Sequence, residues 1–354
     1  MPVHGLSSLT AAGGRGKNRV HERRSPMARM TVGLTYDLRS EWLAEGFSEV
    51  ETAEFDREET VDAIEAAVRA EGHRTERIGN HRSLMAALAA GTRWDLVFNI
   101  CEGMHGLGRE ALVPALLDAY RIPYTFSDPV VLSVSLHKAM TKRIVRDAGV
   151  ATPGFSVVEA LEDVEAVALP YPLFAKPLGE GTGKGIDPTS RIGDAGELRR
   201  VCEKLLAEYR QPVLVEEYLP GREFTTGIVG TGAAAEAVGT MEVILLDAAE
   251  AHAYSYVNKE QCEERVLYEL APEKDASACA SLALRAWRAL GGRDAGRIDI
   301  RMDSKGVPNF IEVNPLAGLH PKHSDLPIIC TKVGIGFQEL IRRILASAST
   351  RVGA

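Results

Sequence analysis

Hydrophobic residues in the first third of the chain follow the patterns of strands that alternate with helices. Apolar runs predict strands at residues 31–37, 94–101 and 122–125. Between the first two, Val61, Ile64 and Val68 recur at helical spacing after an acidic run, and a further helix begins at Arg109. Strands that alternate with helices in this way are typical of a parallel α/β layer.

The segment 151–154, Ala-Thr-Pro-Gly, interrupts this pattern after a helix near residues 136–147. Beyond it the sequence predicts strands at 173–176, 213–217, 223–229, 241–246, 296–302 and 309–314, and helices at 195–209, 276–290 and 336–346. Antiparallel strands with flanking helices are typical of an α+β unit. The predicted fold class is therefore α/β in the first part of the chain and α+β in the rest.

Residues 296–315 predict a β-hairpin that turns at Lys305-Gly306. In this register the numbers of paired residues add up to 611, so Asp299 faces Glu312 and Arg297 faces Asn314. Alternation puts these four on one face and Ile298, Ile300, Ile311 and Val313 on the other. Two carboxylates about 5 Å apart repel each other unless a cation lies between them, and such oxygen ligands suit Mg²⁺ or Mn²⁺. A solvated polar face with a different turn is the alternative.

A glycine-rich loop follows the strand that ends at Lys176, with glycines at positions 179, 181, 183 and 185. Such a loop lets backbone N–H groups close over phosphates, and Lys176 adds a positive charge. It is not a Walker loop, because Gly185 stands where Ser or Thr would follow Lys184. Its position in the middle of the chain also argues against a Rossmann fingerprint. A flexible surface turn is the alternative.

A third motif is the strand that ends in Glu216-Glu217 and turns at Pro220-Gly221. Its end can offer backbone groups and a carboxylate to an adenine edge, and Glu223 is placed to accept hydrogen bonds from ribose hydroxyls. The alternative is a pair of exposed acids at a strand end, which is common by composition.

Composition and charge narrow the class of protein. Among the 354 residues, 45% are hydrophobic, and no stretch approaches the roughly 18 apolar residues of a membrane-spanning helix. The net charge of −8 divides into +5 for residues 1–29 and −13 for the rest, and an acidic body argues against nucleic-acid binding. Residues 1–29 are interpreted as a disordered basic tail or a mis-assigned start. The five cysteines form no CxxC pair, which favours reduced thiols and a cytoplasmic location.

The order and spacing of these motifs resemble the ATP-grasp superfamily, specifically its D-alanine–D-alanine ligase branch, over residues 93–346. The most specific part is Glu312-Val-Asn-Pro315 after Arg297-Ile-Asp299. The resemblance implies that ATP and Mg²⁺ (or Mn²⁺) are clasped between two of three units. These are an N-terminal α/β domain (30–127), a central lid domain (128–215) and a C-terminal catalytic domain (216–348).

The resemblance also implies a role for each motif residue. The implied phosphate contacts are Lys138, Lys176, Gly181, Thr182 and Gly183, and the contacts to adenine and ribose are Glu216, Glu217, Leu219 and Glu223. The implied metal ligands are Asp299, Glu312 and Asn314. The implied catalytic residues are Arg297, Lys259 and Thr182. The implied residues of the amino-acid site are His105, Glu110 and Gly318.

The function that the resemblance implies is an ATP-dependent ligase that joins a carboxylate to an amine through an acyl phosphate. Two departures from the branch, the sequence of residues 35–41 and Glu260 after Lys259, predict that D-alanine with D-alanine is a poor substrate pair. An amide-forming enzyme of a specialised pathway and a non-catalytic nucleotide-binding regulator are the alternatives. We expect small amino-acid-like substrates, no nucleic-acid or membrane partner, and allow for a homodimer.

Overall fold

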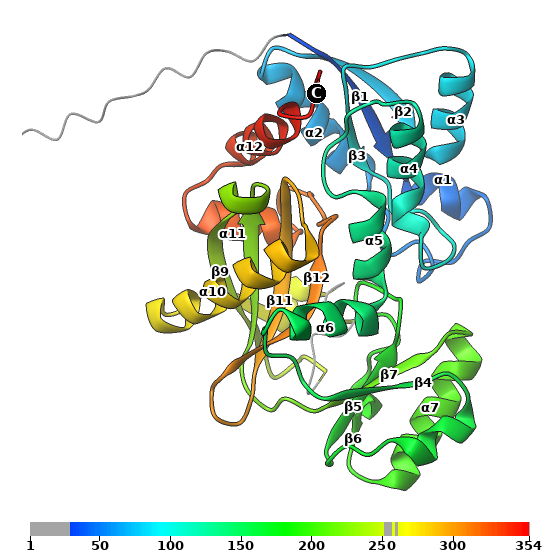
Figure 1. Ribbon diagram of the computed structural model, residues 1–354, viewed down its shortest axis with the longest axis vertical. Coiled ribbons are helices and arrows are strands. Elements are labelled where there is room, and N and C mark those ends of the chain that lie inside the picture. Colours follow the sequence, from blue (N-terminus) through cyan, green and yellow to red (C-terminus); the bar gives the residue numbers. More distant parts are fainter. Residues whose placement is uncertain (1–28, 251–256, 259–260, 354) are drawn as a thin grey trace, which may run out of the picture.

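Three β-sheets form the framework of the computed structural model, which describes residues 29–250, 257–258 and 261–353 (Figure 1). The first sheet is parallel, with the order β2-β1-β3, and its strands are β1 (Thr31–Tyr36), β2 (Arg74–Gly79) and β3 (Leu96–Ile100). Its helices are α1 (Arg39–Ala44), α2 (Glu58–Ala70), α3 (His81–Ala89) and α4 (Leu112–Ala119). The predicted parallel α/β layer is confirmed.

Two details of the first sheet differ from the sequence prediction. The predicted strand at 122–125 is wrong, because only a single bridge joins Tyr124 to Val97. The backbone is left-handed at Arg121 (φ 54°) and Phe126 (φ 70°), so the extended stretch between them is too short for a ladder. Strand β2 was not predicted, since its sequence, Arg-Thr-Glu-Arg-Ile-Gly, is mostly polar and the strand lies at the sheet edge.

The second sheet is antiparallel, with the order β4-β7-β5-β6. Its strands are β4 (Phe155–Val158), β5 (Leu173–Pro177), β6 (Arg191–Ile192) and β7 (Val213–Glu217), and α7 (Ala195–Tyr209) covers it. The core between sheet and helix includes Leu173, Val215 and Leu198. Because β7 runs to Glu217, the predicted boundary between residues 215 and 216 falls inside a strand.

The third sheet has the order β10-β9-β8-β11-β12 and is antiparallel. Its strands are β8 (Glu223–Val229), β9 (Glu236–Leu245), β10 (Val266–Leu270), β11 (Ala295–Met302) and β12 (Pro308–Asn314). Helix α10 (Glu273–Leu290) packs on one face through the buried Trp287. Helix α11 (Asp325–Lys332) reaches the other face closely because β9 carries Gly239, whose added Cβ would lie 2.8 Å from Ile329. The short helix α9 spans Cys262–Arg265.

The β11–β12 hairpin has the predicted pairing at its functional end. Arg297 pairs with Asn314 and Asp299 with Glu312, as the sequence predicts. A bulge follows Asp299, so Ile300 pairs with Phe310 rather than with Ile311. The prediction that Ile311 lies on the apolar face is therefore wrong: Phe310 is fully buried in its place, and Ile311 lines a cavity beside Glu312.

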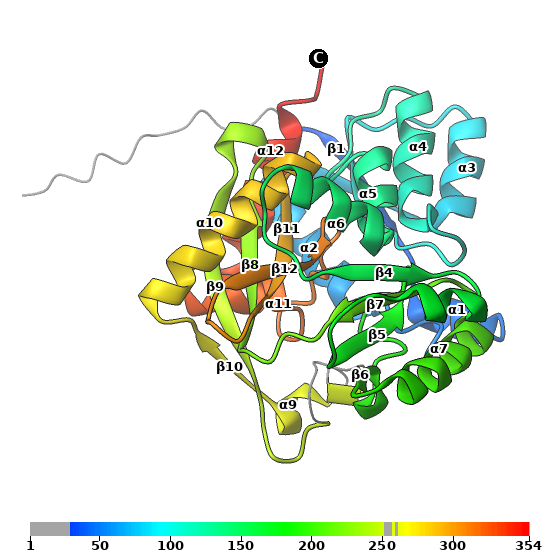
Figure 2. The same cartoon turned by 60° about the horizontal axis from the view of Figure 1, so that its bottom comes forward.

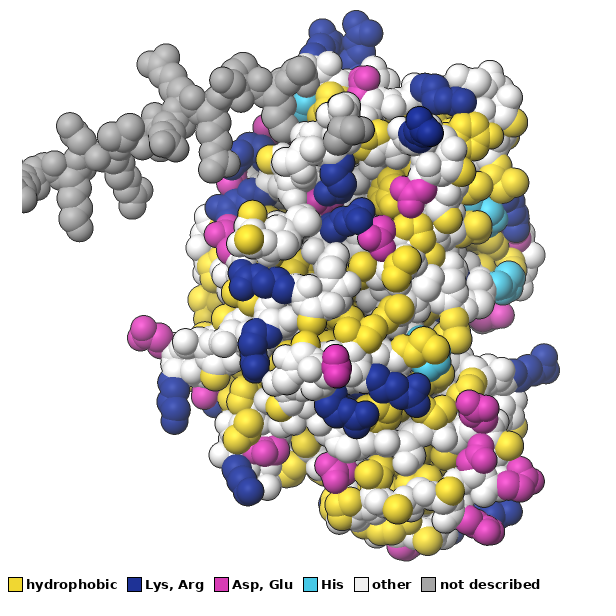
Figure 3. Space-filling view, in the orientation of Figure 1, with side chains coloured by type: hydrophobic (Ala, Val, Ile, Leu, Met, Phe, Trp, Pro, Cys, Tyr) yellow, Lys and Arg dark blue, Asp and Glu magenta, His cyan; other side chains and the backbone are white. Residues whose placement is uncertain are grey.

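Helices connect the three sheets into one arrangement. Helix α12 (Phe337–Ser349) shares a hydrophobic core with α2, so the last helix of the chain packs against the domain of the first sheet (Figure 1). Helices α5 (Pro129–Leu136) and α6 (Lys138–Asp147) follow one another, and α6 lies between the second and third sheets in both views (Figures 1 and 2). Acidic and basic side chains are interspersed on the face in Figure 3. No described helix is long and apolar enough to cross a membrane.

Candidate active site

The polar face of the β11–β12 hairpin is joined by hydrogen bonds and ion pairs around Asp299. Asp299 Oδ1 accepts from Thr225 Oγ1 at 2.7 Å and lies 3.3 Å from Arg297 Nε. Its Oδ2 accepts from Asn314 Nδ2 at 3.1 Å. Arg297 Nε also lies 3.4 Å from Asp325 Oδ2, which the sequence did not single out. The predicted Arg297, Asp299 and Asn314 therefore lie together.

Two buried lysines approach the fourth member of this face. Lys138 Nζ lies 3.7 Å and Lys176 Nζ 3.9 Å from Glu312 Oε2, and both lysine side chains are at most 8% exposed. Burial lowers the pKa of Lys138, and the neighbouring Lys176 acts in the same direction. Burial also acts to lower the pKa of Lys176, but Glu216 and Glu312 outweigh it and the pKa is raised. Three predicted residues from α6, β5 and β12 thus meet at one point.

Glu216 on β7 lies between two lysines. Its Oε2 is 3.3 Å from Lys176 Nζ and its Oε1 is 2.5 Å from Lys142 Nζ. Burial opposes the charge of Glu216, but Lys142 and Lys176 outweigh it and the pKa is lowered. Burial lowers the pKa of Lys142 to about 8, although Glu216 acts against this. Lys142 was not predicted. Its signal in the sequence is its spacing of one helical turn from Lys138, on the same face of α6.

A narrow cavity of about 80 Å³ lies beside this cluster, between the second and third sheets. Its lining includes the predicted nucleotide residues Lys138, Lys176, Gly183, Glu216, Glu217, Leu219 and Glu223. Glu217 accepts a hydrogen bond from Gly154 N at 3.1 Å, and Glu223 lies 3.4 Å from Arg301. Phe174 and Tyr218 add aromatic rings with a centroid separation of 6.4 Å. Charged side chains make up much of this lining and the two rings and Leu219 add apolar surface, so the cavity suits a ligand that has both a charged and a flat apolar part.

The glycine loop after Lys176 folds back toward the first sheet. Thr182 has φ 52° and Gly183 φ 73°, a left-handed turn that a glycine adopts without strain. Gly181 N donates to Glu54 Oε1 at 2.8 Å, and Lys184 Nζ lies 3.4 Å from the same oxygen. The loop is therefore attached to the loop before α2 through Glu54, a contact that the sequence did not predict.

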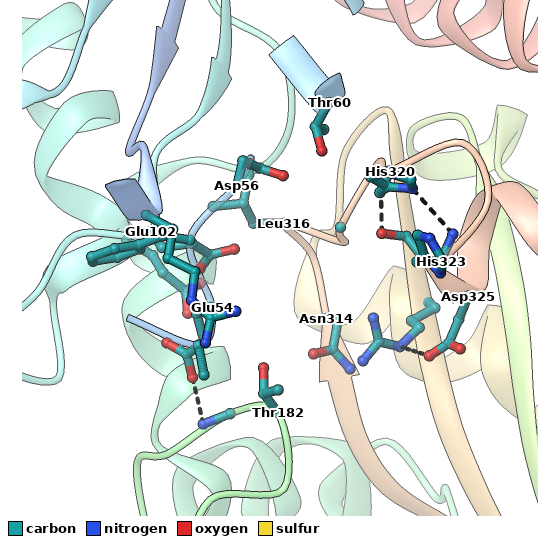
Figure 4. Close-up of a pocket in the computed structure, with 18 of the residues that line it drawn as sticks. Glu54, Asp56, Thr60, Glu102, Thr182, Asn314, Leu316, His320, His323 and Asp325 are labelled. Atoms are coloured by element: carbon teal, nitrogen blue, oxygen red, sulfur yellow. Dashed lines mark hydrogen bonds and ion pairs between the residues drawn. The ribbon is translucent and has the colours of Figure 1, made fainter. Parts of the chain in front are cut away.

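A second cavity, of about 1070 Å³, begins where the narrow one ends (Figure 4). Lys138, Glu180 and Glu312 line both. Figure 4 shows Glu54, Asp56 and Glu102 on one wall and Asn314, His323 and Asp325 on the opposite wall, with Thr182 below. Further predicted residues that line this cavity are Gly181, Arg297, Glu110 and Gly318.

The wall from the first sheet is acidic. Burial holds the pKa of Glu102 well above its ordinary range, and the charge of Glu110 adds to this. Burial raises the pKa of Glu110 to about 7 and that of Asp56 also to about 7. Perturbed carboxyls in a cleft are typical of functional sites.

Two predicted site residues, His105 and Lys259, are not found in the lining of either cavity among the described residues. His105 is exposed, packs near Phe47 with ring centroids 6.0 Å apart, and lines neither cavity. Glu102, three residues earlier, lines the large cavity. Lys259, like Glu260, lies outside the described residues. His320 and His323 form a tilted pair with centroids 4.5 Å apart in the wall of the large cavity.

Comparisons with known proteins place the chain among known relatives. Residues 144–346 match the family model described as D-ala D-ala ligase C-terminus. The D-alanine–D-alanine ligase of Bordetella petrii is 34% identical over 275 residues, which cover 77% of this chain and 80% of that protein. The D-alanine–D-alanine ligase of Xanthomonas axonopodis pv. citri is 31% identical over 288 residues, covering 79% and 86%.

Solved structures show the same arrangement of sheets. The D-alanine–D-alanine ligase of Bacillus anthracis, crystallised with ATP, has a TM-score of 0.68 at 20% identity and covers 91% of this chain and 98% of that chain. The VanG D-Ala:D-Ser ligase of Enterococcus faecalis has a TM-score of 0.69 at 17% identity, with 90% and 99% covered. The fold is therefore the ATP-grasp fold, with a parallel N-terminal sheet. The chain belongs to the D-alanine–D-alanine ligase family, whose members are ATP-dependent ligases.

Proposed function

We propose that the protein phosphorylates a carboxylate with ATP and couples the acyl phosphate to an amine, forming a C–N bond and releasing ADP and phosphate. The observation that carries this proposal is the position of Glu312, which lines both cavities and lies within 4 Å of two buried lysines. A nucleotide in the narrow cavity would present its phosphates at the entrance of the large one. Phosphoryl transfer depends mainly on such positioning and on charge neutralisation.

The residues of the narrow cavity would bind ATP. Lys138 and Lys176 would contact the phosphates, and the backbone of the loop at 181–183 would close over them. Glu216 and Leu219 would meet the adenine, with Glu217 beside them, and Glu223 would accept from the ribose hydroxyls. The lysines, Gly183 and the four residues assigned to adenine and ribose all line the narrow cavity, which supports this assignment.

The residues of the large cavity would bind the carboxylate and the amine. Arg297 would stabilise charge on the transferring oxygens, because its guanidinium lies beside Asp299 on the strand that borders the cavity. Thr182, Glu110 and Gly318 would shape the amino-acid site, and the predicted catalytic Lys259 would act from outside the described residues. The reaction needs no covalent intermediate with the protein, so no side-chain nucleophile is required.

Asp299, Glu312 and Asn314 fit a Mg²⁺ or Mn²⁺ ion by their chemistry, since all three offer oxygen atoms on one face of the hairpin. When bound, the ion would neutralise negative charge on the ATP phosphates. Among the described residues there is no cluster of three or more His, Cys, Asp or Glu side chains that could hold a metal alone. Phosphate oxygens and water would then complete the coordination, as is usual for Mg²⁺.

The chain would divide into three units, each built on one sheet: residues 30–127, 128–217 and 218–348. The second boundary is moved to follow Glu217, the last residue of β7. The hydrophobic cluster of the second sheet, which lies entirely within residues 158–215, supports this division. Because the proposed reaction uses ATP, we also propose a cytoplasmic location. The proposed assembly is a homodimer, and light scattering tests it.

Phosphate release from Mg-ATP, measured with pools of D- and L-amino acids, tests the proposed function. We expect release to require both ATP and a carboxylate substrate, and the nucleotide product to be ADP. The variant Glu312→Gln should lose this activity, while Glu203→Gln, a change at an exposed position outside both cavities, should retain it. Production of AMP, or nucleotide binding without turnover in every pool, would overturn the proposal and favour a regulator.

A further inference from the structure

In the acidic wall of the large cavity, the carboxylate of Glu54 forms ion pairs with two cations. Glu54 Oε2 lies 3.0 Å from Arg109 Nη2, and Glu54 Oε1 lies 3.4 Å from Lys184 Nζ and accepts from Gly181 N at 2.8 Å. Arg109 also donates to the carbonyl oxygen of Gly179 at 3.0 Å. Arg109 and Lys184 are therefore both engaged in holding Glu54 and the glycine loop together.

Glu102 and Glu110 line the same wall, and neither side chain forms a hydrogen bond or an ion pair with any residue that the structure describes. Arg109, which is paired with Glu54, acts electrostatically on both, and Lys138 acts on Glu110. Their like charges raise the cost of ionising both carboxyls, although the two side chains are only partly buried. A cationic ligand in the cavity would offset this repulsion.

A third group on this wall lacks a partner. Ser135 is 6% exposed, its hydroxyl has no hydrogen-bond partner, and it lines the large cavity. It lies in the last turn of α5, an eight-residue helix that ends at Leu136. The carboxyl end of a helix carries partial negative charge and favours a cation. A buried hydroxyl without a partner, next to a negative helix end, is suited to accept a hydrogen bond from an ammonium group.

The acidic wall is separate from the point where phosphoryl transfer is proposed. Figure 4 shows Glu102 and Asp56 across the cavity from Asn314 and Asp325. The volume of about 1070 Å³ slightly exceeds the range of roughly 300–1,000 Å³ for ligand pockets, so there is room for a substrate longer than alanine.

We propose that one substrate carries a second ammonium group, in addition to the α-ammonium of an amino acid and to the groups that react. Glu102, Glu110 and Ser135 bind this second ammonium. The substrate class is a diamino acid or another amine with a second cationic nitrogen. An ammonium at this position would offset both carboxylates and satisfy the Ser135 hydroxyl at once. The inference rests on the proposed ligase function and specifies which substrate the same site selects.

A thermal-shift comparison tests binding independently of turnover. The full-length protein is saturated with Mg²⁺ and a non-hydrolysable ATP analogue and then titrated with D- and L-ornithine. Norleucine, which replaces the terminal ammonium of ornithine by a methyl group, is the matched ligand. We expect ornithine to bind at least about tenfold more tightly than norleucine, the factor that one lost charge-assisted hydrogen bond corresponds to.

The variants Glu102→Gln and Glu110→Gln should reduce this preference to about twofold or less by removing the charge that attracts the ammonium. Ser135→Ala should reduce it less, and Glu203→Gln, at an exposed position outside both cavities, should leave it unchanged. Equal binding of ornithine and norleucine in the wild type, or an unchanged preference in both glutamate variants, would overturn the inference. The proposed function fails separately, if the ATP analogue itself causes no shift or no amino acid elicits phosphate release.

Discussion

Replacing Lys142 by Met should destabilise the protein by about 2–3 kcal/mol, because Glu216 loses its closer cation. Lys142 Nζ lies 2.5 Å from Glu216 Oε1, and the two side chains are 0% and 4% exposed. Removing one partner of a buried ion pair costs about 3–5 kcal/mol. The expected loss is smaller here, since Lys176 Nζ remains 3.3 Å from Glu216 Oε2. The ammonium of Lys142 also donates to Thr152 Oγ1 at 3.0 Å, and that hydroxyl in turn donates to the carbonyl oxygen of Phe310 at 2.9 Å.

Urea-induced unfolding, followed by fluorescence and circular dichroism, measures this loss, provided that the two transitions coincide. The matched control is Lys204→Met, because Lys204 lies 2.7 Å from Asp187 but is 51% exposed. That surface pair should contribute less than about 1 kcal/mol. The double variant Lys142→Met with Glu216→Gln should lose less stability than the sum of the two single losses, by more than about 1 kcal/mol. Additive losses within about 0.5 kcal/mol would show that Lys142 and Glu216 are not coupled.

Three further predictions follow from the site. Asp299→Ala and Glu312→Ala should abolish ATP-dependent phosphate release and leave the circular dichroism spectrum unchanged; near-normal release in both would refute the metal assignment. Glu54→Gln should accelerate hydrogen exchange in residues 179–185, because Gly181 N donates to Glu54 at 2.8 Å, and unchanged exchange would show that this contact does not hold the loop. Glu110→Gln should stabilise the protein more at pH 8 than at pH 5. Burial raises the pKa of Glu110 to about 7. Between the ordinary pKa of a glutamate in the unfolded chain and pH 7, the folded state therefore binds a proton that the unfolded state has lost. The wild type loses stability as the pH rises through this window. An equal effect at both pH values, measured by urea unfolding, would contradict this.

The part of the site that lies on one hairpin could be predicted because it depends on local rules. Strand alternation and the turn at Gly306 suffice to pair Asp299 with Glu312 and Arg297 with Asn314. The bulge after Asp299 could not be predicted, since Ile311 and Phe310 are both apolar and either could fill the core. The error therefore begins where packing, rather than periodicity, selects the register.

The acidic wall could not be predicted because its members are far apart in the sequence. Glu54 belongs to an acidic run that reads as a solvated helix start, yet the structure places it against the glycine loop about 130 residues later. Glu102 follows the buried strand β3 and was not predicted, because the resemblance implied a role for His105 instead. No feature of the sequence distinguishes Ser135 from other serines, since only the lack of a hydrogen-bond partner in the folded state marks it.

The transfer of an oxygen atom from the substrate carboxylate to phosphate tests the central claim most directly. The protein would be incubated with Mg-ATP, an amine and an amino acid whose carboxylate carries ¹⁸O, and the released phosphate analysed by mass spectrometry. Because an acyl phosphate joins the carboxylate oxygen to the γ-phosphorus, and the amine then displaces phosphate at carbon, each phosphate should carry one ¹⁸O atom. Phosphate that contains no ¹⁸O, although ADP and the amide are both formed, would contradict the acyl-phosphate mechanism and the roles assigned to Arg297 and Glu312.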